Sequence, residues 1–512
     1  MYSHKLNVNI LTSVLLAHGI EEAVVCPGSR NAPLVHNLHA TQRIRLHSVV
    51  DERSAAFVAI GLYLQTRRPV VVCVTSGSAV LNTLPGVAEA ALRHIPLLII
   101  SADRPPEWIG QLDGQTLPQT NALHPYAPCF TLVEPHTADQ QWWCERVANE
   151  AILATAQRGG QPVQINVPLS EPLLQCTTNE LPTVRKIEQF RPQSKHPLPE
   201  HIVEQITAAQ CPVLVIGQWE EGGIPAVDQL RQRGQLLVYS EDLSQQGDSH
   251  TADWLDKGEV SPDLVIHIGG AMVSKHFKLF LRRLENCPVV RISTNEELPD
   301  TFCHLQSHVI ASPQAALAQL AELLPTKPAV VALAEQIAAS APEPCHFPQL
   351  EAIFLGNSMA VRWGNRFFAR TAHPIYGNRG TNGIEGSLSV AAGYALAAQG
   401  QVLCVIGDLS FFYDINALWN RQIDGRLRIL LINNGRGEIF HRLPALQATP
   451  ALDQYVAAAH QATARGVAES YDCTYLSLHV DNFAAQADSL IRTLLEIESE
   501  RPVIYEIFTP NF

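Results

Sequence analysis

The chain has 512 residues, a length beyond which a single hydrophobic core stops growing, so several domains are expected. Hydrophobic residues make up 46% of the chain and charged residues 17%, a balance that excludes a disordered or fibrous protein. The formal net charge of −13 argues against non-specific binding to nucleic acid or to anionic membranes and favours a small-molecule substrate. An anionic substrate would therefore need a local cluster of Arg and Lys.

The eleven Cys are scattered singly, with no Cys-x-x-Cys pair and no spacing typical of a zinc site. This pattern indicates reduced thiols in a cytoplasmic protein. The apolar stretch at the N-terminus is too short for a signal peptide or anchor, and no other apolar run has membrane-spanning length. We expect a cytoplasmic protein that is not attached to a membrane.

Short runs of Val, Ile and Leu alternate with Ala-rich stretches along the chain, a pattern typical of parallel sheets covered by helices. Strands are predicted within three sets of segments: 21–28, 68–77 and 95–106; 211–218, 234–242, 261–270 and 287–293; 373–380, 401–410, 427–435 and 501–508. In the first set each strand ends in Gly, Ser or Pro, where the chain turns. Their carboxyl ends should line a crevice.

Two polar, Pro-bearing segments, 185–201 and 324–350, separate these sets and are the expected linkers. The sequence therefore predicts three doubly wound α/β domains with parallel sheets, at 1–184, 185–345 and 346–512. No short repeat or low-complexity tract is present, which argues against a solenoid.

The strongest functional pattern lies in the third set. The apolar run 401–406 leads directly into Gly407-Asp408-Leu409-Ser410, a helical segment is predicted over 411–423, and the next apolar run ends in Asn433-Asn434-Gly435. Neighbouring parallel strands would bring the Asp408 and Asn434 oxygens to one edge, where they suit a hard divalent cation and a diphosphate. Taken alone, Gly-Asp indicates only a helix N-cap.

Together these two motifs resemble the fingerprint of thiamine diphosphate enzymes. The resemblance implies thiamine diphosphate held through Mg²⁺ or Mn²⁺, with Asp408, Asn434 and the backbone carbonyl of Arg436 as metal ligands. It also requires an activating Glu beside the pyrimidine of the cofactor. Glu52, between a strand-like run and an Ala-rich helix, occupies the family position, although by itself it would be an ordinary first-turn residue.

Further segments narrow the resemblance to the MenD family, the 2-succinyl-5-enolpyruvyl-6-hydroxy-3-cyclohexene-1-carboxylate synthases. These segments are 26–34, 74–79, 101–107, 356–358 with Arg362, 378–380, 407–410 and 439–440. The likeness runs from about residue 10 to residue 445 and is weakest in the middle domain. It implies a thiamine diphosphate-dependent decarboxylation of 2-oxoglutarate and addition of the succinyl unit to isochorismate in menaquinone biosynthesis.

Both implied substrates are dicarboxylates, which suits Arg because its guanidinium grips a carboxylate with two parallel hydrogen bonds. As catalytic residues the resemblance implies Glu52, Arg30, Gln115, Lys275, Ser358, Arg362 and Arg379. Further substrate-binding residues would be Ser29, His276, Ile439 and Phe440. Of these, Ser29, Arg30, Gln115 and Lys275 would face isochorismate, whereas Ser358, Arg362 and Arg379 would hold carboxylates nearer the cofactor.

The cofactor itself would contact residues of the first and third domains. Ile384 is the expected aliphatic wedge that keeps it bent, and the other contacts implied are Glu52, Ser76, Gly77, Gly407, Asp408, Leu409, Ser410, Asn434 and Ile439. Two positions depart from the family pattern, Gly114 where Asn is frequent and His276 where Arg is frequent. Each removes a polar or cationic group from the expected isochorismate pocket.

Three alternatives remain at this stage. The first is another thiamine diphosphate-dependent decarboxylase or carboligase, such as an acetolactate synthase. A non-catalytic or nicotinamide-dependent Rossmann protein is disfavoured because no Gly-x-Gly-x-x-Gly joins a strand to a helix. A cofactor-free binding homologue is disfavoured by the presence of Glu52, Asp408 and Asn434 together.

The resemblance also implies an assembly. Glu52 falls in the first domain and the metal ligands in the third, and in resembling enzymes these meet across a subunit interface. We therefore expect a homodimer or a dimer of dimers with active sites at that interface.

Overall fold

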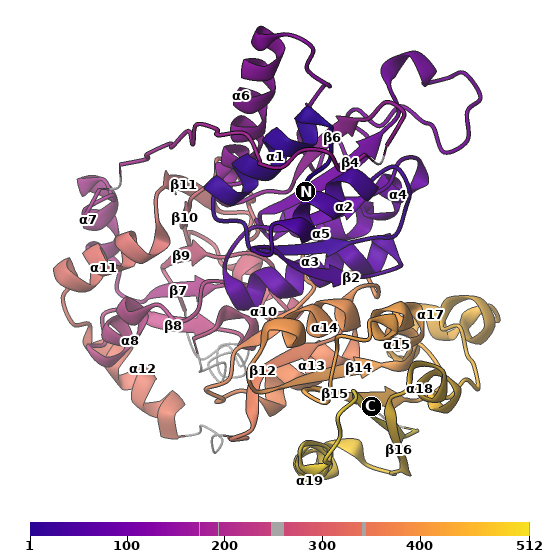
Figure 1. The fold of residues 1–512 in the computed structure, drawn as a ribbon. Helices are drawn as coiled ribbons and strands as arrows, with labels where there is room; N and C mark the ends of the chain where they lie inside the picture. Colours follow the sequence, from indigo (N-terminus) through magenta and orange to yellow (C-terminus); the bar gives the residue numbers. More distant parts are fainter. Residues whose placement is uncertain (174, 193, 247–260, 340–344, 511–512) are drawn as a thin grey trace. The chain divides into compact units, whose positions relative to one another are not determined.

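The computed structural model of the chain describes residues 1–173, 175–192, 194–246, 261–339 and 345–510 (Figure 1). It contains three β-sheets in which every described strand pairing is parallel, so the expected α/β class is confirmed. The chain forms two compact units, Met1–Gln189 with Gly380–Phe512, and Phe190–Arg379. The division into three domains stays a prediction, and residues 340–344 of the second expected linker lie outside the described residues.

The N-terminal part of the first unit is built on a six-stranded sheet with strand order β2-β1-β3-β4-β6-β5. Its strands are β1 (Glu22–Val25), β2 (Arg45–Ser48), β3 (Val70–Val74), β4 (Leu97–Asp103), β5 (Cys129–Thr131) and β6 (Val163–Pro168). The chain runs from β1 to β2 on one side of β1 and then returns to β3 on its other side. A crevice at the carboxyl ends of β1 and β3 follows from this order.

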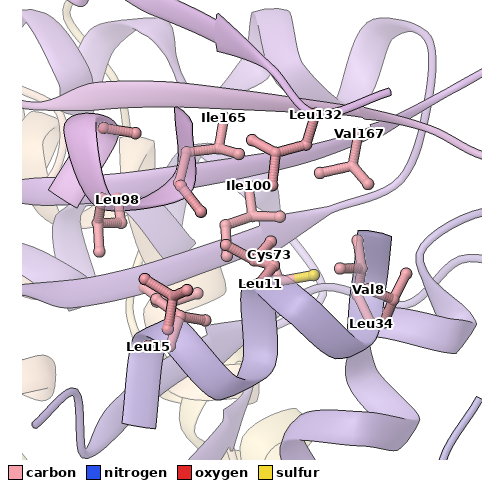
Figure 2. Packing of buried hydrophobic residues seen from close by; sticks show 14 of the residues in the cluster. Val8, Leu11, Leu15, Leu34, Cys73, Leu98, Ile100, Leu132, Ile165 and Val167 are labelled. Atoms are coloured by element: carbon pink, nitrogen blue, oxygen red, sulfur yellow. The ribbon is translucent and has the colours of Figure 1, made fainter. Parts of the chain in front are cut away.

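The helices of this part are α1 (Leu6–Ala17), α2 (Ala32–Ala40), α3 (Glu52–Thr66), α4 (Ser78–Asn82), α5 (Leu84–Leu92) and α6 (Ala138–Ala154), with the 3-10 turns η1 (Pro106–Trp108) and η2 (Gln157–Gly159). Val8, Leu11 and Leu15 recur at helical spacing on α1 and are buried against the sheet, as Figure 2 shows. Burial of each side chain contributes about 1.5–3 kcal/mol. This apolar face fixes α1 on the sheet.

The C-terminal part of the first unit carries strands β14 (Gln401–Gly407), β15 (Leu427–Asn433), β17 (Val503–Phe508) and β16 (Thr474–His479), which pair in this order. Its helical segments are α14 (Ser387–Ala397), α15 (Asp408–Tyr413), η4 (Ile415–Trp419), α16 (Glu438–His441), α17 (Pro444–Gln447), the π-helical η5 (Leu452–Val456), α18 (Arg465–Tyr471) and α19 (Phe483–Glu496). The carboxyl ends of β14 and β15 are adjacent because these strands pair along their whole length.

Helix α3 of the N-terminal part packs against α14 of the C-terminal part with the backbones in direct contact. A Cβ at Gly61 would collide with the carbonyl oxygen of Val390, and one at Gly393 would collide with that of Val58. Both positions therefore require glycine. This reciprocal contact joins the two parts of the first unit.

The second unit contains a five-stranded sheet of order β11-β10-β9-β7-β8. Its elements are α7 (Glu200–Ala208), β7 (Pro212–Ile216), α8 (Pro225–Gln232), β8 (Leu237–Ser240), η3 (Asp242–Ser244), β9 (Leu264–Ile268), α10 (Lys275–Arg283), β10 (Val289–Ser293), β11 (Leu305–Ile310), α11 (Pro313–Leu323), α12 (Pro328–Ala339), β12 (Leu350–Leu355), α13 (Met359–Phe367) and β13 (Ile375–Gly377). Strands β12 and β13 pair with each other in parallel.

One predicted element is wrong in detail. The helix expected over 411–423 is instead the end of α15 followed by the 3-10 turn η4. The break falls at Asp414, whose carboxylate accepts hydrogen bonds from the backbone N–H and the hydroxyl of Ser389 (both 2.7 Å). A side chain that caps α14 therefore interrupts the helix.

Within the described ranges, no single helix is long and apolar enough to cross a membrane. Only the pair Pro313–Leu323 and Pro328–Gln336, bent by 114°, meets both measures when its helices are taken together.

Candidate active site

The Asp408 carboxylate lies at the carboxyl end of β14, against the turn that follows β15. Its Oδ2 accepts hydrogen bonds from the backbone N–H groups of Asn434 (3.1 Å) and Gly435 (2.8 Å). Its Oδ1 accepts one from the N–H of Leu409 (2.7 Å). The two motifs that the sequence singled out therefore meet at one edge of the sheet.

The oxygens at this edge suit a hard cation. A carboxylate oxygen has two lone pairs, so Oδ1 of Asp408 keeps one for a metal after accepting from Leu409. The side-chain oxygen of Asn434 accepts a single hydrogen bond, from the N–H of Arg436 at 3.3 Å. The expected donors, a carboxylate, an amide oxygen and a backbone carbonyl, match the ligands that Mg²⁺ and Mn²⁺ prefer.

No group of three His, Cys, Asp or Glu side chains that could hold a metal ion occurs in the described part of the chain. The expected ligand set differs from such clusters because it draws on one Asp, one Asn and a carbonyl. These residues fit the metal, and the assignment of ligands stays a prediction.

Sequence reasoning missed His460, which lies beside this edge. Its Nε2 is 3.5 Å from Oδ2 of Asp408, and its backbone N–H donates to the carbonyl of Gly435 (2.8 Å). A cavity of about 310 Å³ adjoins it at the ends of β15, β16 and β17. The segment around His460 is apolar and carries no motif, so only the fold brings it here.

Burial raises the pKa of the Asp408 carboxyl above its ordinary value. The amides of Leu409, Gly435 and Asn434 and the charge of His460 act in the opposite direction because they stabilise the ionised form. Asp408 is only 4% exposed, so its charge is screened little by solvent. A buried anion of this kind calls for a cationic partner.

The other residues expected at the cofactor surround this edge. Gly407 is the last residue of β14, and Ser410 is buried in α15. Ile439 and Phe440 are half-buried on α16, which begins four residues after Asn434 along the chain. Both can supply an apolar wall next to the metal ligands.

Glu52 is the first residue of α3, where Asp51 caps the helix by accepting a hydrogen bond from the Arg53 N–H (2.9 Å). Glu52 is half-buried, and that burial raises the pKa of its carboxyl. A hydrogen bond with the Asn82 side chain opposes the increase. The side chain thus has the raised proton affinity that an activating carboxyl needs.

The turn after β3 provides a second anchoring point at the edge of the first sheet. The Gly77 N–H donates to Oε1 of Gln119 (2.6 Å), and Gly77 has a positive φ of 86°. Gln115 lies against Gly77 and is exposed, whereas Ser76 is buried. Gln119, which sequence reasoning did not identify, therefore holds the segment that carries Gln115.

Arg30 follows β1 and is buried, whereas the preceding Ser29 is exposed. The Arg30 guanidinium donates to the Leu169 carbonyl (2.9 Å) and lies 3.1 Å from the carboxylate of the exposed Glu171. Burial and the neighbouring charge of Arg104 lower the pKa of Arg30. A substrate carboxylate could replace Glu171 beside this pair of cations.

The expected wedge, Ile384, belongs to a loop that α5 holds in place. Glu89, fully buried on α5, accepts hydrogen bonds from the N–H of Gly380 (3.0 Å) and from the N–H (2.7 Å) and hydroxyl (2.8 Å) of Thr381. Ile384 is 39% exposed. The loop therefore presents an apolar side chain on a fixed base.

In the second unit, two of the expected Arg side chains contact the segment before α13. Arg379 donates to the side-chain oxygen of Asn357 (3.0 Å), and Arg362 donates to the carbonyl of Ser358 (2.5 Å). Ser358 has a positive φ of 67° and precedes the helix. These contacts bring Ser358, Arg362 and Arg379 together.

Lys275 and His276 open α10 of the second unit, and both are exposed. Glu241 fixes the start of this helix because its carboxylate accepts hydrogen bonds from the N–H groups of Val273 (2.5 Å) and Ser274 (2.7 Å). No described hydrogen bond or ion pair of the chain joins Glu52 to Asp408 or Asn434. The roles of all these residues stay predictions.

Two segments of the chain match known protein families. Residues 8–124 match the family described as "Thiamine pyrophosphate enzyme, N-terminal TPP binding domain". Residues 356–507 match "Thiamine pyrophosphate enzyme, C-terminal TPP binding domain". The expectation of a thiamine diphosphate enzyme is thereby confirmed.

Full-length relatives are more specific. The 2-succinyl-5-enolpyruvyl-6-hydroxy-3-cyclohexene-1-carboxylate synthase of Bacteroides thetaiotaomicron is 36% identical over 99% of this chain and 97% of its own length. The synthase of the same name from Bacteroides fragilis is 37% identical with the same coverage, and that of Desulfotalea psychrophila is 31% identical over 98% of both chains. The chain belongs to this synthase family. Membership in the synthase family therefore replaces the two alternatives of a nicotinamide-dependent protein and an acetolactate-type enzyme.

Proposed function

We propose that the chain is a 2-succinyl-5-enolpyruvyl-6-hydroxy-3-cyclohexene-1-carboxylate synthase that decarboxylates 2-oxoglutarate and joins the succinyl unit to isochorismate. The observation that carries the proposal is the meeting of the Asp408 carboxylate with the Asn434 turn. Similarity to synthases of this name along almost the whole chain supports the choice of reaction.

Asp408, Asn434 and the carbonyl of Arg436 would hold Mg²⁺ or Mn²⁺ and, through it, the diphosphate of the cofactor. When bound, thiamine diphosphate supplies the electron sink that stabilises a carbanion. Gly407, Leu409 and Ser410 would contact the diphosphate end. Ile384, Ile439 and Phe440 would exclude water from the reacting end of the cofactor.

Glu52 would hold the proton that activates the pyrimidine ring of the cofactor, with Ser76 and Gly77 as neighbouring contacts. Burial supports this role because it raises the pKa of the Glu52 carboxyl and so favours the protonated form. The Asn82 side chain would orient the carboxyl.

The cations of the chain would bind the two dicarboxylate substrates. Arg362 and Arg379, with Ser358, would hold the carboxylate of 2-oxoglutarate that is retained in the product. The residues left for isochorismate are Ser29, Arg30, Gln115, Lys275 and His276. The buried Arg30, with the half-buried Arg104 nearby, supports an anion site there, because one exposed carboxylate, Glu171, is the only ion-pair partner described for Arg30.

We also propose that the chain forms a homodimer, or a dimer of dimers, in which a second copy covers the start of α3. Asp51 accepts a hydrogen bond from the Asn416 side chain (2.8 Å), which joins this end of α3 to η4. Several large apolar side chains around these elements are at least 41% exposed: Val50, Leu81, Leu92, Tyr413 and Trp419. Exposure of this kind supports an interface.

We also propose that the protein is cytoplasmic. All eleven Cys are free, as expected in a reducing compartment.

The test is to incubate the purified protein with 2-oxoglutarate, isochorismate, thiamine diphosphate and Mg²⁺ and to analyse the products by mass spectrometry. The expected product has the mass of isochorismate plus 2-oxoglutarate minus carbon dioxide. A matched incubation with pyruvate in place of 2-oxoglutarate should give no adduct. Product from pyruvate alone would instead support an acetolactate-type enzyme.

A further inference from the structure

The two neighbours of Glu52 at the start of α3 both bond to the segment that ends α15 and begins η4. Oδ2 of Asp51 accepts a hydrogen bond from the side-chain amide of Asn416 (2.8 Å). The guanidinium of Arg53 donates to the backbone carbonyl of Tyr413 (2.8 Å) and lies over the Tyr413 ring, 4.6 Å from its centroid. This segment of the C-terminal part therefore holds the residues before and after Glu52.

The same segment is fixed in turn by Asp414. The fully buried carboxylate of Asp414 accepts hydrogen bonds from Ser389 on α14, 2.7 Å from both the N–H and the hydroxyl. Helix α14 packs against α3 with the backbones in contact at Gly61 and Gly393. These contacts form a closed ring, from the middle of α3 through α14 and Asp414 to Asn416 and back to the start of α3. The start of α3 cannot move within the unit without breaking a bond of this ring.

Asp51 joins this ring to the first turn of α3 because its two carboxylate oxygens have different partners. Oδ1 caps the helix by accepting from the Arg53 N–H (2.9 Å), whereas Oδ2 accepts from Asn416. The backbone carbonyl of Asp51 also accepts from the Ala55 N–H (2.9 Å), which closes the first turn around Glu52. A cap that a second element holds keeps this turn in one place. The position of the Glu52 carboxyl therefore depends on the contact with Asn416.

We infer that Asn416 is a positioning residue for Glu52, which acts through the Asp51 cap and sets the place of the activating carboxyl. This inference rests on the proposed function, because the activating role of Glu52 comes from there. Arg53 and Tyr413 form a second contact that serves the same end. A misplacement of about 1 Å at a catalytic group can slow a reaction about 100-fold, so a contact that fixes the first turn has a measurable kinetic effect.

The contact is first tested in the protein without cofactor. Backbone amides in the first turn of α3 should exchange with deuterium about tenfold faster in Asn416→Ala than in the wild type, because loss of the hydrogen bond makes that turn easier to open. Exchange around Gly61, farther along α3, should stay unchanged. The matched control is Gln422→Ala, which removes another side-chain hydrogen bond between the two parts of the unit, to the Leu46 carbonyl (3.1 Å), and should change neither region. Equal exchange in Asn416→Ala and the wild type would show that Asn416 does not hold the turn.

The effect on Glu52 is measured in the holoenzyme without substrate. The rate at which bound thiamine diphosphate exchanges its thiazolium C2 proton with deuterated water, followed by proton NMR after an acid quench, reports on the activating carboxyl. Asn416→Ala should slow this exchange about tenfold to 100-fold, while calorimetry should give a Kd for thiamine diphosphate within about threefold of the wild type. In steady-state kinetics kcat should fall, whereas the KM for each substrate should change less than about threefold. Gln422→Ala should match the wild type in all three measurements.

A double variant shows whether Asn416 acts through Glu52. In a Glu52→Gln background, Asn416→Ala should slow C2 exchange less than about threefold further, because the group that it positions is already gone. Further slowing as large as in the wild-type background would contradict the inference. Exchange at the wild-type rate in Asn416→Ala, beside slow exchange in Glu52→Gln, would overturn the inference and leave the function standing. Exchange at the wild-type rate in Glu52→Gln would instead overturn the proposed role of Glu52.

An exchange of donor and acceptor controls for loss of fold. Asn416→Asp places a second carboxylate against Asp51, so it should slow C2 exchange at least as much as Asn416→Ala. Adding Asp51→Asn gives the pair one donor and one acceptor again, and Asn caps a helix as well as Asp does. The double variant should therefore exchange within about threefold of the wild-type rate. Slow exchange in a double variant that melts at the wild-type temperature would overturn the inference.

Discussion

Two Glu residues on neighbouring helices of the first unit differ in how their carboxylates are satisfied. Glu89 on α5 is fully buried and accepts three hydrogen bonds from Gly380 and Thr381, with Arg93 3.6 Å away. Glu52 on α3 is half-buried and hydrogen-bonds with the Asn82 side chain. A carboxylate whose hydrogen-bonding capacity is filled holds a structure in place, whereas a carboxylate with fewer hydrogen bonds is available for chemistry.

The largest effect is expected from Glu52→Gln, which keeps the shape of the side chain and removes its proton. Turnover should fall about 10²–10⁴-fold, as for the loss of a general acid–base group. Cofactor affinity and melting temperature should stay close to those of the wild type. Product formation at the wild-type rate would remove Glu52 from the mechanism.

Asp408→Ala should act on binding instead of on proton transfer. Loss of a charged ligand worth about 3 kcal/mol predicts Mg²⁺-dependent affinity for thiamine diphosphate weakened about 100-fold or more. Calorimetry with and without Mg²⁺ measures this effect. An affinity equal to that of the wild type would contradict the metal site, and Asp424→Ala at the far end of β15 serves as the control.

Asp414 resembles Glu89 because its carboxylate is fully buried and accepts two hydrogen bonds from Ser389. Burial raises its pKa to about 6, above the ordinary 3.8, so the folded protein holds the proton more tightly than the unfolded chain. This stabilisation is complete below pH 3.8 and is lost as the pH rises through 6. It amounts to about 3 kcal/mol.

This pH-dependent stabilisation is measured by comparing the wild type with Asp414→Asn, whose side chain does not titrate. The stability of the wild type relative to this variant should decrease between pH 4 and pH 7. Melting temperatures measured across that range provide the readout. A difference independent of pH would show that Asp414 keeps its ordinary pKa.

The smallest effect is expected from Glu89→Gln, the counterpart of Glu52→Gln. Gln offers one acceptor oxygen in place of two, which leaves N–H donors of the 380–381 segment unsatisfied at a cost of about 1–3 kcal/mol. The melting temperature should fall while turnover per folded molecule is kept near that of the wild type below the transition. Glu107→Gln, at an exposed position, is the control.

The sequence predicted most of the strands that are buried on both faces, because they read as continuous apolar runs, but it missed the buried strand β12. The strands it missed include β2, β5, β11 and β16, which lie at sheet edges or carry partly exposed residues. β6 was missed for another reason: Gln164 and Asn166 interrupt its apolar pattern and hydrogen-bond with Ser101 instead. Edge position and buried polar networks leave no periodic signal.

The candidate site divides in a similar way. Asp408 and Asn434 were predictable because each directly follows an apolar strand, and the pairing of β14 with β15 brings them together. His460 has no such local signal. Its position depends on a hydrogen bond between segments far apart in the chain, from its backbone N–H to the Gly435 carbonyl.

The backbone contact between α3 and α14 has a consequence for synthesis on the ribosome. The ribosome synthesises the N-terminal part first. The whole second unit, Phe190–Arg379, must then be synthesised before α14 exists. At about 5–20 residues per second this takes roughly 10–40 s. During that interval the Gly61 surface of a nascent α3 lacks its partner, so the first unit completes its folding only near the end of translation.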